Sequence, residues 1–125
     1  MKVILDTNFL IYCAKEKLDY IEEINNILNE GFDLVVPEQV IEELKRLRIK
    51  AKKGKDKDAC DLALKILDKK KINIVYPAGK SVDDAIIQLA QENSKNIVCT
   101  LDREMRWELG RVILISRGKK LILTR

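Results

Sequence analysis

Four acidic residues occupy positions from which folding would bring scattered carboxylates together. Asp6 lies in VILDTNFLIY, Glu43 in VIEELKRL, Asp83 in SVDDAIIQLA and Asp102 in IVCTLDRE. Each is next to apolar residues that are expected in a core, so one edge of a sheet would gather all four. Crowded carboxylates repel one another unless a divalent cation neutralises them. The sequence therefore predicts an oxygen-only site for a hard cation, Mg²⁺ or Mn²⁺.

Histidine is absent from the chain, which narrows the possible chemistry considerably. Without it there is no Ser-His-Asp or Cys-His arrangement, no histidine general base and no imidazole ligand for zinc. Cys13, Cys60 and Cys99 lie far apart in apolar surroundings and lack the paired spacing of a zinc site. They are expected to be buried, reduced thiols. Carboxylate chemistry remains, with or without a metal.

The composition indicates a single globular domain over residues 1–125. The chain is 46% hydrophobic and 35% charged, with five Gly and two Pro, as is usual for a folded domain of this size. Its apolar runs are much shorter than the roughly 20 residues that span a bilayer. We therefore expect a cytosolic protein that does not enter a membrane.

Positive charge is concentrated in one segment. Residues 45–57, KRLRIKAKKGKDK, contain eight basic side chains and one acidic side chain, a balance of +7 within a chain whose total is +4. Such a cluster favours a polyanionic partner, because lysine and arginine near phosphates release counterions on binding. A solvated, lysine-rich surface of the kind found in heat-adapted proteins is the alternative. The residues expected to contact a nucleic acid are Arg46, Lys50, Lys52, Lys53, Lys55 and Arg103.

Short β-like runs alternate with longer helical patterns, which predicts an α/β fold with helices on both faces of a parallel sheet. The expected strands are residues 2–5, 33–36, 72–76, 96–100 and 112–115, with a last β segment at 120–123. The expected helices are residues 7–14, 18–30, a segment from Pro37 to Gly54, 57–70, 82–93 and 102–109. Ser81 is placed to cap the helix at 82–93.

These elements decide which acids can face a common site. Asp6 and Asp102 follow strands, where parallel sheets carry their functional groups. Glu43 lies about 70° from the centre of the apolar face of its helix, whereas the neighbouring Glu42 lies about 170° away. Asp83 lies about 60° from the buried side of the later helix and Asp84 about 160° away. Glu43 and Asp83 are therefore preferred, with Asp84 as a weaker second.

The order of these motifs, DTNFLIY, EEL, DDAIIQLA and TLDRE, resembles that of the PIN domain family of nucleases over almost the whole chain. The resemblance implies a three-layer fold around a five-stranded parallel sheet of order 3-2-1-4-5, and Mg²⁺- or Mn²⁺-dependent cleavage of RNA. It places the family's acids on Asp6, Glu43, Asp83 and Asp102, and further polar contacts on Asn8, Thr100 and Glu104. Within the family, IVCTLDREMR and the closing GRVILISRGKKLIL look closer to the small-subunit ribosomal-RNA-processing nucleases and their archaeal relatives than to the VapC toxins.

The carboxylate chemistry assigns a role to each acid. Asp6 and Asp102 are expected to be the principal metal ligands, and Asp83 would complete the site directly or through water. Glu43 would orient the attacking water or hold a second metal ion. Asn8 and Thr100 would fix the carboxylates by hydrogen bonds. The alternative is a purely structural role, in which Asp6 and Asp102 only cap helices, and Glu43 and Asp83 only lie at the edge of the apolar face of their helices.

Three other functions stay open from the sequence. One is a toxin-type ribonuclease with an antitoxin partner, and another is a non-catalytic RNA-binding or ribosome-assembly factor of the same fold. The third is a phosphoryl-transfer domain, which the Asp-Thr-Asn motif disfavours because it lacks a second aspartate. A homodimer and a ribosomal precursor are further possible partners. For Phe9, Tyr12, Tyr20 and Trp107, packing in the core or at an interface is preferred to base stacking.

Overall fold

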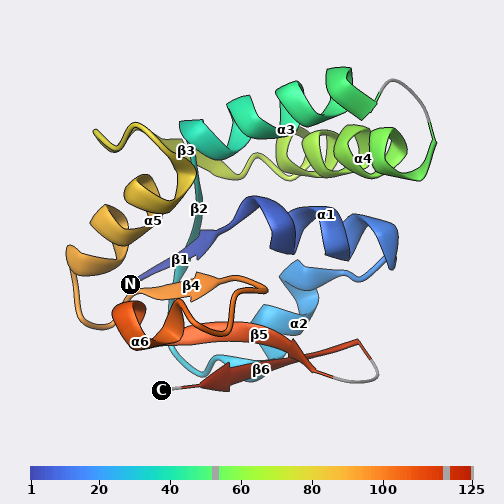
Figure 1. The fold of residues 1–125 in the computed structure, drawn as a ribbon. Helices are drawn as coiled ribbons and strands as arrows, with labels where there is room; N and C mark the ends of the chain where they lie inside the picture. The colour runs from blue at the N-terminus through green and yellow to red at the C-terminus, as the bar shows by residue number, and fades with distance from the viewer. Residues whose placement is uncertain (52–53, 117–118, 125) are drawn as a thin grey trace.

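A six-stranded sheet forms the centre of the computed structural model, which describes residues 1–51, 54–116 and 119–124 (Figure 1). The strands are β1 (Lys2–Leu5), β2 (Asp33–Pro37), β3 (Asn73–Val75), β4 (Ile97–Cys99), β5 (Val112–Ser116) and β6 (Lys120–Thr124). Their order is β3-β2-β1-β4-β5-β6. All neighbours among the first five strands pair in parallel, which confirms the predicted α/β fold and the order 3-2-1-4-5.

The sixth strand extends this sheet in the opposite direction. β6 pairs antiparallel with β5, so that Val112 lies opposite Thr124 and Ser116 lies opposite Lys120. The connection between Ser116 and Lys120 is much shorter than the crossover of about a dozen residues that a parallel neighbour requires, so the chain has to turn back on itself. The β segment predicted near the end of the chain is therefore an antiparallel edge strand.

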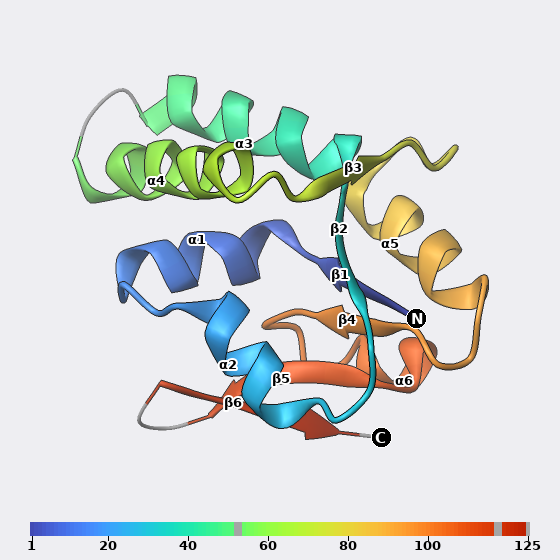
Figure 2. The same cartoon turned by 180° about the vertical axis from the view of Figure 1, so that it is seen from behind.

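Helices cover both faces of the sheet, as Figure 1 and the view from behind in Figure 2 show. They are α1 (Thr7–Lys15), α2 (Tyr20–Ile27), α3 (Glu38–Ala51), α4 (Lys55–Lys69), α5 (Val82–Gln91) and α6 (Arg106–Leu109). Val3 and Leu5 pack into a core with α1, α2, α3 and α4, whereas Ile4 packs with α5 on the other face. Successive side chains of a strand point to opposite faces, so β1 contributes to both cores. None of the described helices is long and apolar enough to cross a membrane.

Two polar side chains cap the N-termini of helices at the carboxyl edge of the sheet. Asp6 caps α1, and Ser81 caps α5 by accepting a 3.1 Å hydrogen bond from the backbone N–H of Asp84, as predicted. The helix predicted at 102–109 is shorter, because only Arg106–Leu109 is helical. The Asp102 carboxylate accepts a 2.9 Å bond from the backbone N–H of Glu104, a local turn that competes with helix formation. Asp102 therefore lies on a turn and not on a helix.

The aromatic residues follow the prediction with one exception. Phe9 and Tyr20 are buried and meet edge to face, with ring centroids 5.9 Å apart. Tyr12 is half-buried. Trp107 is 81% exposed on α6, so this side chain does not pack in the core, and its packing at an interface stays a prediction. Helical spacing explains the exposure, since Met105 supplies the buried contact of this segment and Trp107 follows it by two residues.

The cysteines are buried and form no disulfide, as predicted. Burial raises the pKa of the Cys13 thiol to about 12 and raises that of the Cys99 thiol well above its ordinary value. Both side chains are therefore neutral thiols that serve as small apolar core residues.

Candidate active site

Asp6 is the most constrained acid at the carboxyl edge of the sheet. Its backbone N–H donates a 3.1 Å hydrogen bond to the carbonyl of Cys99, which ties the end of β1 to β4. Its side chain is only 6% exposed. Oδ1 accepts a 2.7 Å bond from the backbone N–H of Thr7, and Oδ2 accepts a 2.8 Å bond from the hydroxyl of Thr100. The two bonds hold the carboxylate in one orientation.

Thr100 connects Asp6 to the turn that contains Asp102. The Thr100 hydroxyl donates to Asp6 and accepts a 3.1 Å hydrogen bond from the backbone N–H of Asp102. Thr100 is fully buried, and its own backbone N–H donates to the carbonyl of Ile113 in β5. One hydroxyl, used as donor and acceptor, thus sets the turn of Asp102 relative to the carboxylate of Asp6.

The carboxylate of Asp102 is exposed and belongs to a turn that supports itself. Its Oδ1 accepts from the backbone N–H of Glu104, and its carbonyl accepts from that of Met105 at 3.3 Å. Met105 is buried, which fixes the turn to the core below it. Glu104 is itself exposed beside Asp102. The segment presents two acids to solvent at the end of β4.

Glu43 and Asp83 approach the same place from two helices. The pKa of Asp6 is raised, chiefly because burial penalises the charged carboxylate; the hydrogen bonds from Thr100 and Thr7 oppose the shift, and the negative charges of Asp83 and Glu43 add to it. Glu43 on α3 is half-buried while Glu42 is exposed, as the helical angles predict. These charges act on Asp6 although the three acids come from separate parts of the fold: Asp6 lies between β1 and α1, Glu43 lies on α3 and Asp83 lies on α5.

The donor chemistry of the site fits a hard cation. The four acids offer only carboxylate oxygens, and the repulsion on Asp6 is the kind that a divalent ion relieves. Within the described part of the chain, no three acidic, cysteine or histidine side chains are close enough together to hold an ion by themselves. Water would have to complete the coordination, which suits Mg²⁺ because this ion keeps several waters when one or two carboxylates bind it.

Gln39 is a residue of this region that the sequence did not single out. Its Nε2 donates hydrogen bonds of 2.8 Å to the carbonyl of Pro77 and 2.7 Å to that of Gly79. Gln39 lies one turn before Glu43 on α3, and the two carbonyls lie just before α5. A Cβ at Gly79 would collide with the backbone of Ala85. Gln39 therefore fixes the start of α5, which contains Asp83, against the start of α3.

The remaining predicted contacts lie on the surface. Asn8 is exposed in the first turn of α1, and Asp84 is exposed beside Asp83 on α5. Arg46, Lys50, Lys55 and Arg103 are all exposed, whereas Lys52 and Lys53 lie outside the described residues. Arg46 and Lys50 therefore share α3 with Glu43, and Arg103 is next to Asp102, whereas Lys55 begins α4.

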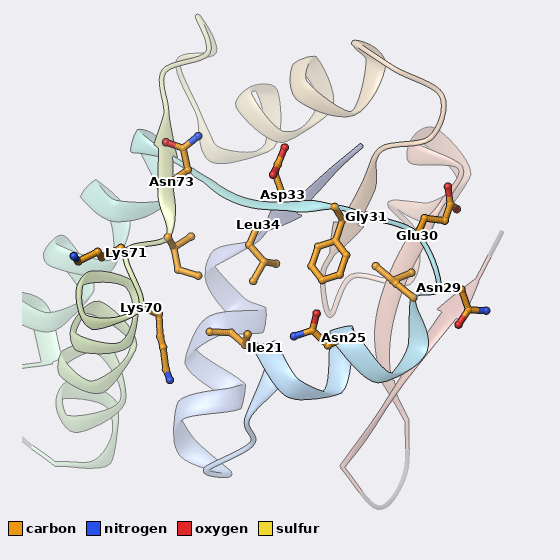
Figure 3. Close-up of a pocket in the computed structure, with 13 residues that line it drawn as sticks. Ile21, Asn25, Asn29, Glu30, Gly31, Asp33, Leu34, Lys70, Lys71 and Asn73 are labelled. Carbon is orange, nitrogen blue, oxygen red and sulfur yellow. The ribbon is translucent and has the colours of Figure 1, made fainter.

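The cavity shown in Figure 3 lies away from the four acids. It has a volume of about 670 Å³ and lies at the amino ends of β2 and β3, where Asp33 and Asn73 begin these strands. Asn25 of α2 and Lys70 at the end of α4 contribute to its walls (Figure 3). Its described lining includes none of the four acids, so the size of a cavity does not locate the candidate active site here.

Comparisons with known proteins show which family the chain belongs to. A family model described as a PIN like domain matches residues 3–122. Ribonuclease VapC4 of Methanocaldococcus jannaschii is 40% identical over 123 residues, which cover 95% of this chain and 92% of that protein. Among solved structures, the PIN domain endonuclease Utp24 superposes with a TM-score of 0.78 at 22% identity, covering 98% of this chain and 90% of that one.

A domain of a protein of unknown function from Methanocaldococcus jannaschii also has this fold, with a TM-score of 0.59 at 15% identity over 97% of this chain and 95% of that one. These two structural similarities concern the fold alone. The family match covers nearly the whole chain, and the 40% identity extends over most of both sequences. The chain therefore belongs to the PIN-like domain family.

Proposed function

We propose that this protein is a divalent-metal-dependent ribonuclease that hydrolyses phosphodiester bonds of RNA as an endonuclease. The observation that carries the proposal is the electrostatic crowding of Asp6. A buried carboxylate whose pKa is raised by burial and by the charges of Asp83 and Glu43 costs free energy when it is ionised. Such an arrangement is typical of a functional site and is unusual for a helix cap alone.

The proposal gives each of the four acids a role. Asp6 and Asp102 would be the principal ligands, Asp83 would complete the site through water, and Glu43 would orient the water that attacks phosphorus. At these residues, Mg²⁺ or Mn²⁺ would neutralise the carboxylates and would lower the pKa of a bound water molecule. Asp6 is already held by Thr7 and Thr100, so it presents its remaining lone pairs in a fixed direction. Asn8 and Glu104 lie at the exposed rim, where they can bind water or RNA.

RNA would reach the acids across basic surfaces. Arg46 and Lys50 lie on the helix that also contains Glu43, and Arg103 is next to Asp102. A negatively charged site repels phosphate, so cations nearby are needed to hold the backbone of the substrate. The +7 balance of residues 45–57 supplies them.

The proposal is tested by cleavage of an end-labelled, structured RNA with Mn²⁺, with Mg²⁺ and with EDTA. Asp6→Asn and Asp102→Asn are expected to lose cleavage by a factor of about a hundred or more, while Asp68→Asn on the exposed surface of α4 serves as the matched control. Cleavage that persists in EDTA, or in both site variants, would contradict the proposal. RNA binding without cleavage under any metal would instead favour a binding or assembly factor.

A second candidate for the biological role is a toxin-type ribonuclease with an antitoxin partner. The specific observation in its favour is the 40% identity to ribonuclease VapC4. Growth arrest on expression of the wild type, but not of Asp6→Asn, would support it, as would co-purification of a small partner encoded with this chain. The role in ribosomal RNA processing, predicted from IVCTLDREMR, requires accumulation of an uncleaved ribosomal precursor in cells that lack the protein.

A further inference from the structure

We propose that the outer edge of β6 binds an extended, acidic segment of a partner protein, which adds to the sheet as a further strand. β6 is the last strand in the order β3-β2-β1-β4-β5-β6, and among the described strands it pairs only with β5. It lies at the border of the molecule in both Figure 1 and Figure 2. This edge contains none of the four acids, so the proposal does not depend on the ribonuclease function.

The backbone of β6 can pair on its outer side. In an antiparallel ladder, alternate residues turn their N–H and C=O groups away from the neighbouring strand. The register with β5 runs regularly from Val112 opposite Thr124 to Ser116 opposite Lys120, so no bulge interrupts the edge. Within the described part of the chain, β6 has no backbone hydrogen bonds to any element other than β5. A row of such outward groups is a template for one more strand.

The opposite edge of the sheet is protected in ways that natural proteins commonly use. β3 has only three residues, and Pro77 follows two residues after its end. Short edge strands and proline both limit pairing with another chain. β6 has five residues and contains no proline. Of the two edges, β6 is therefore the one suited to accept a strand.

The side chains of β6 offer apolar contacts on both faces of this edge. Leu121 is buried and Leu123 is half-buried, and both belong to the core that α1 and α2 share. Ile122 points to the other face, where it lies opposite Leu114 of β5 and is 39% exposed. A bound strand would cover Ile122 with an apolar side chain of its own.

The charge around the edge selects the kind of partner. Residues 117–125, RGKKLILTR, contain four basic side chains and no acid. Lys119 makes a 3.1 Å ion pair with Glu16 at the end of α1. Lys120 is exposed and makes no ion pair with any described acid. Opposite charges on facing residues of neighbouring strands stabilise a sheet, so an acidic side chain is favoured opposite Lys120.

A second copy of the chain and an RNA strand both fit this edge less well. Antiparallel self-pairing centred on Ile122 would place position 119 opposite position 125, so that a lysine would face an arginine at each end. RNA would match the charge but has no ladder of peptide N–H and C=O groups. An acidic extended peptide supplies the charge, the ladder and an apolar side chain for Ile122.

The test uses a labelled peptide in which three valines are flanked by two glutamates at each end. Fluorescence anisotropy measures its affinity in EDTA, so that metal plays no part. One control peptide has lysines in place of the glutamates. The other keeps every side chain but is methylated at alternate backbone nitrogens, which removes ladder donors. We expect the acidic peptide to bind at least about tenfold more tightly than either control.

Substitutions connect this binding to β6. Lys120→Glu is expected to weaken binding of the acidic peptide about tenfold and to strengthen binding of the lysine peptide. Lys65→Glu on the exposed surface of α4 makes the same change of charge and is expected to leave both affinities within a factor of two. Ile122→Thr keeps a β-branched side chain and is expected to weaken the acidic peptide several-fold. Thermal unfolding of each variant confirms that it is folded.

Three results would overturn the proposal. The first is equal affinity for the methylated and unmethylated peptides, or an equal loss in Lys120→Glu and Lys65→Glu, because binding would then depend on charge without a ladder. The second is that Lys120→Glu loses affinity for a labelled oligouridine but not for the acidic peptide, which would assign the edge to RNA. The third is a wild-type dimer in sedimentation that Ile122→Lys dissociates, which would assign the edge to a second copy.

Discussion

The hydroxyl of Thr100 donates a 2.8 Å hydrogen bond to Oδ2 of Asp6, although the two residues are 94 positions apart in the sequence. Both side chains are buried, and the bond joins the ends of β1 and β4 at the site. A hydrogen bond to a buried carboxylate stabilises its charged form, so Thr100 opposes the effect of burial on the pKa of Asp6.

Replacement of Thr100 by valine should therefore affect both stability and activity. Valine keeps the shape but leaves Oδ2 of Asp6 and the N–H of Asp102 without a partner. We expect the free energy of unfolding at pH 7 to fall by about 2 kcal/mol, and the pKa of Asp6 to rise further. Urea denaturation measures the first effect. Thr100→Ser retains the hydroxyl and is the control; an equal loss in both variants would mean that the bond is not the cause.

The pH dependence of stability provides a direct test of the environment of Asp6. Its pKa is raised in the folded state, so the folded protein binds the proton more tightly than the unfolded chain does. Stability is therefore highest when Asp6 is protonated and falls as pH rises from the ordinary aspartate range through the raised pKa. In EDTA, Asp6→Asn should be more stable than the wild type at pH 7, and the difference should disappear below about pH 3.8. Denaturation of both proteins from pH 3 to pH 8 checks this, and a wild type that is the more stable at pH 7 would contradict it.

Much of the site could be predicted because it depends on backbone geometry. Strand ends placed Asp6 and Asp102 at one edge, and helical angles separated half-buried Glu43 from exposed Glu42. The same angles did not separate Asp83 from Asp84 by burial, since both are exposed at the first turn of α5. The influence of Asp83 on Asp6 emerges only from the position of α5 in space.

Other features had no signal in the sequence. Gln39 bonds to backbone carbonyls 38 and 40 residues away, and any residue can supply a carbonyl at such a position. The short α6 has a similar explanation: the turn before it depends on the hydrogen bond from the backbone N–H of Glu104 to the Asp102 carboxylate, which the helical pattern of the sequence does not reveal. Side-chain bonds to backbone therefore mark the limit of pattern-based prediction in this chain.

Gln39 provides a prediction about positioning. Gln39→Glu keeps the length of the side chain but replaces the donating Nε2 with an acceptor that faces the carbonyls of Pro77 and Gly79. We expect the start of α5 to shift and the affinity for Mn²⁺ to fall several-fold, because Asp83 moves relative to Asp6. Isothermal titration with Mn²⁺ measures this. Gln91→Glu at the exposed end of α5 is the matched control, and unchanged affinity in Gln39→Glu would argue against a positioning role.

A divalent metal ion should stabilise the folded protein only when the acids of the candidate site are present. A cation that binds the folded protein raises its midpoint of thermal unfolding, and saturation at a hundredfold excess over Kd adds about 2.7 kcal/mol. We expect Mn²⁺ to raise the midpoint of the wild type and of Glu42→Gln, and to have little effect on Asp6→Asn or Asp83→Asn. Equal stabilisation of all four proteins would show that the ions bind elsewhere.

The ends of the RNA fragments test the nature of the nucleophile. If water attacks phosphorus, the bond from phosphorus to the 3′-oxygen breaks, and the products carry a 5′-phosphate and a 3′-hydroxyl. The chain has no histidine to act as a general base on a 2′-hydroxyl, and Glu43 is the candidate to orient water. Ligation of a 5′-adenylated adaptor to untreated 3′ ends detects the hydroxyl directly. A 2′,3′-cyclic phosphate would mean that the RNA itself is the nucleophile, and the assignment of Glu43 would then have to be abandoned.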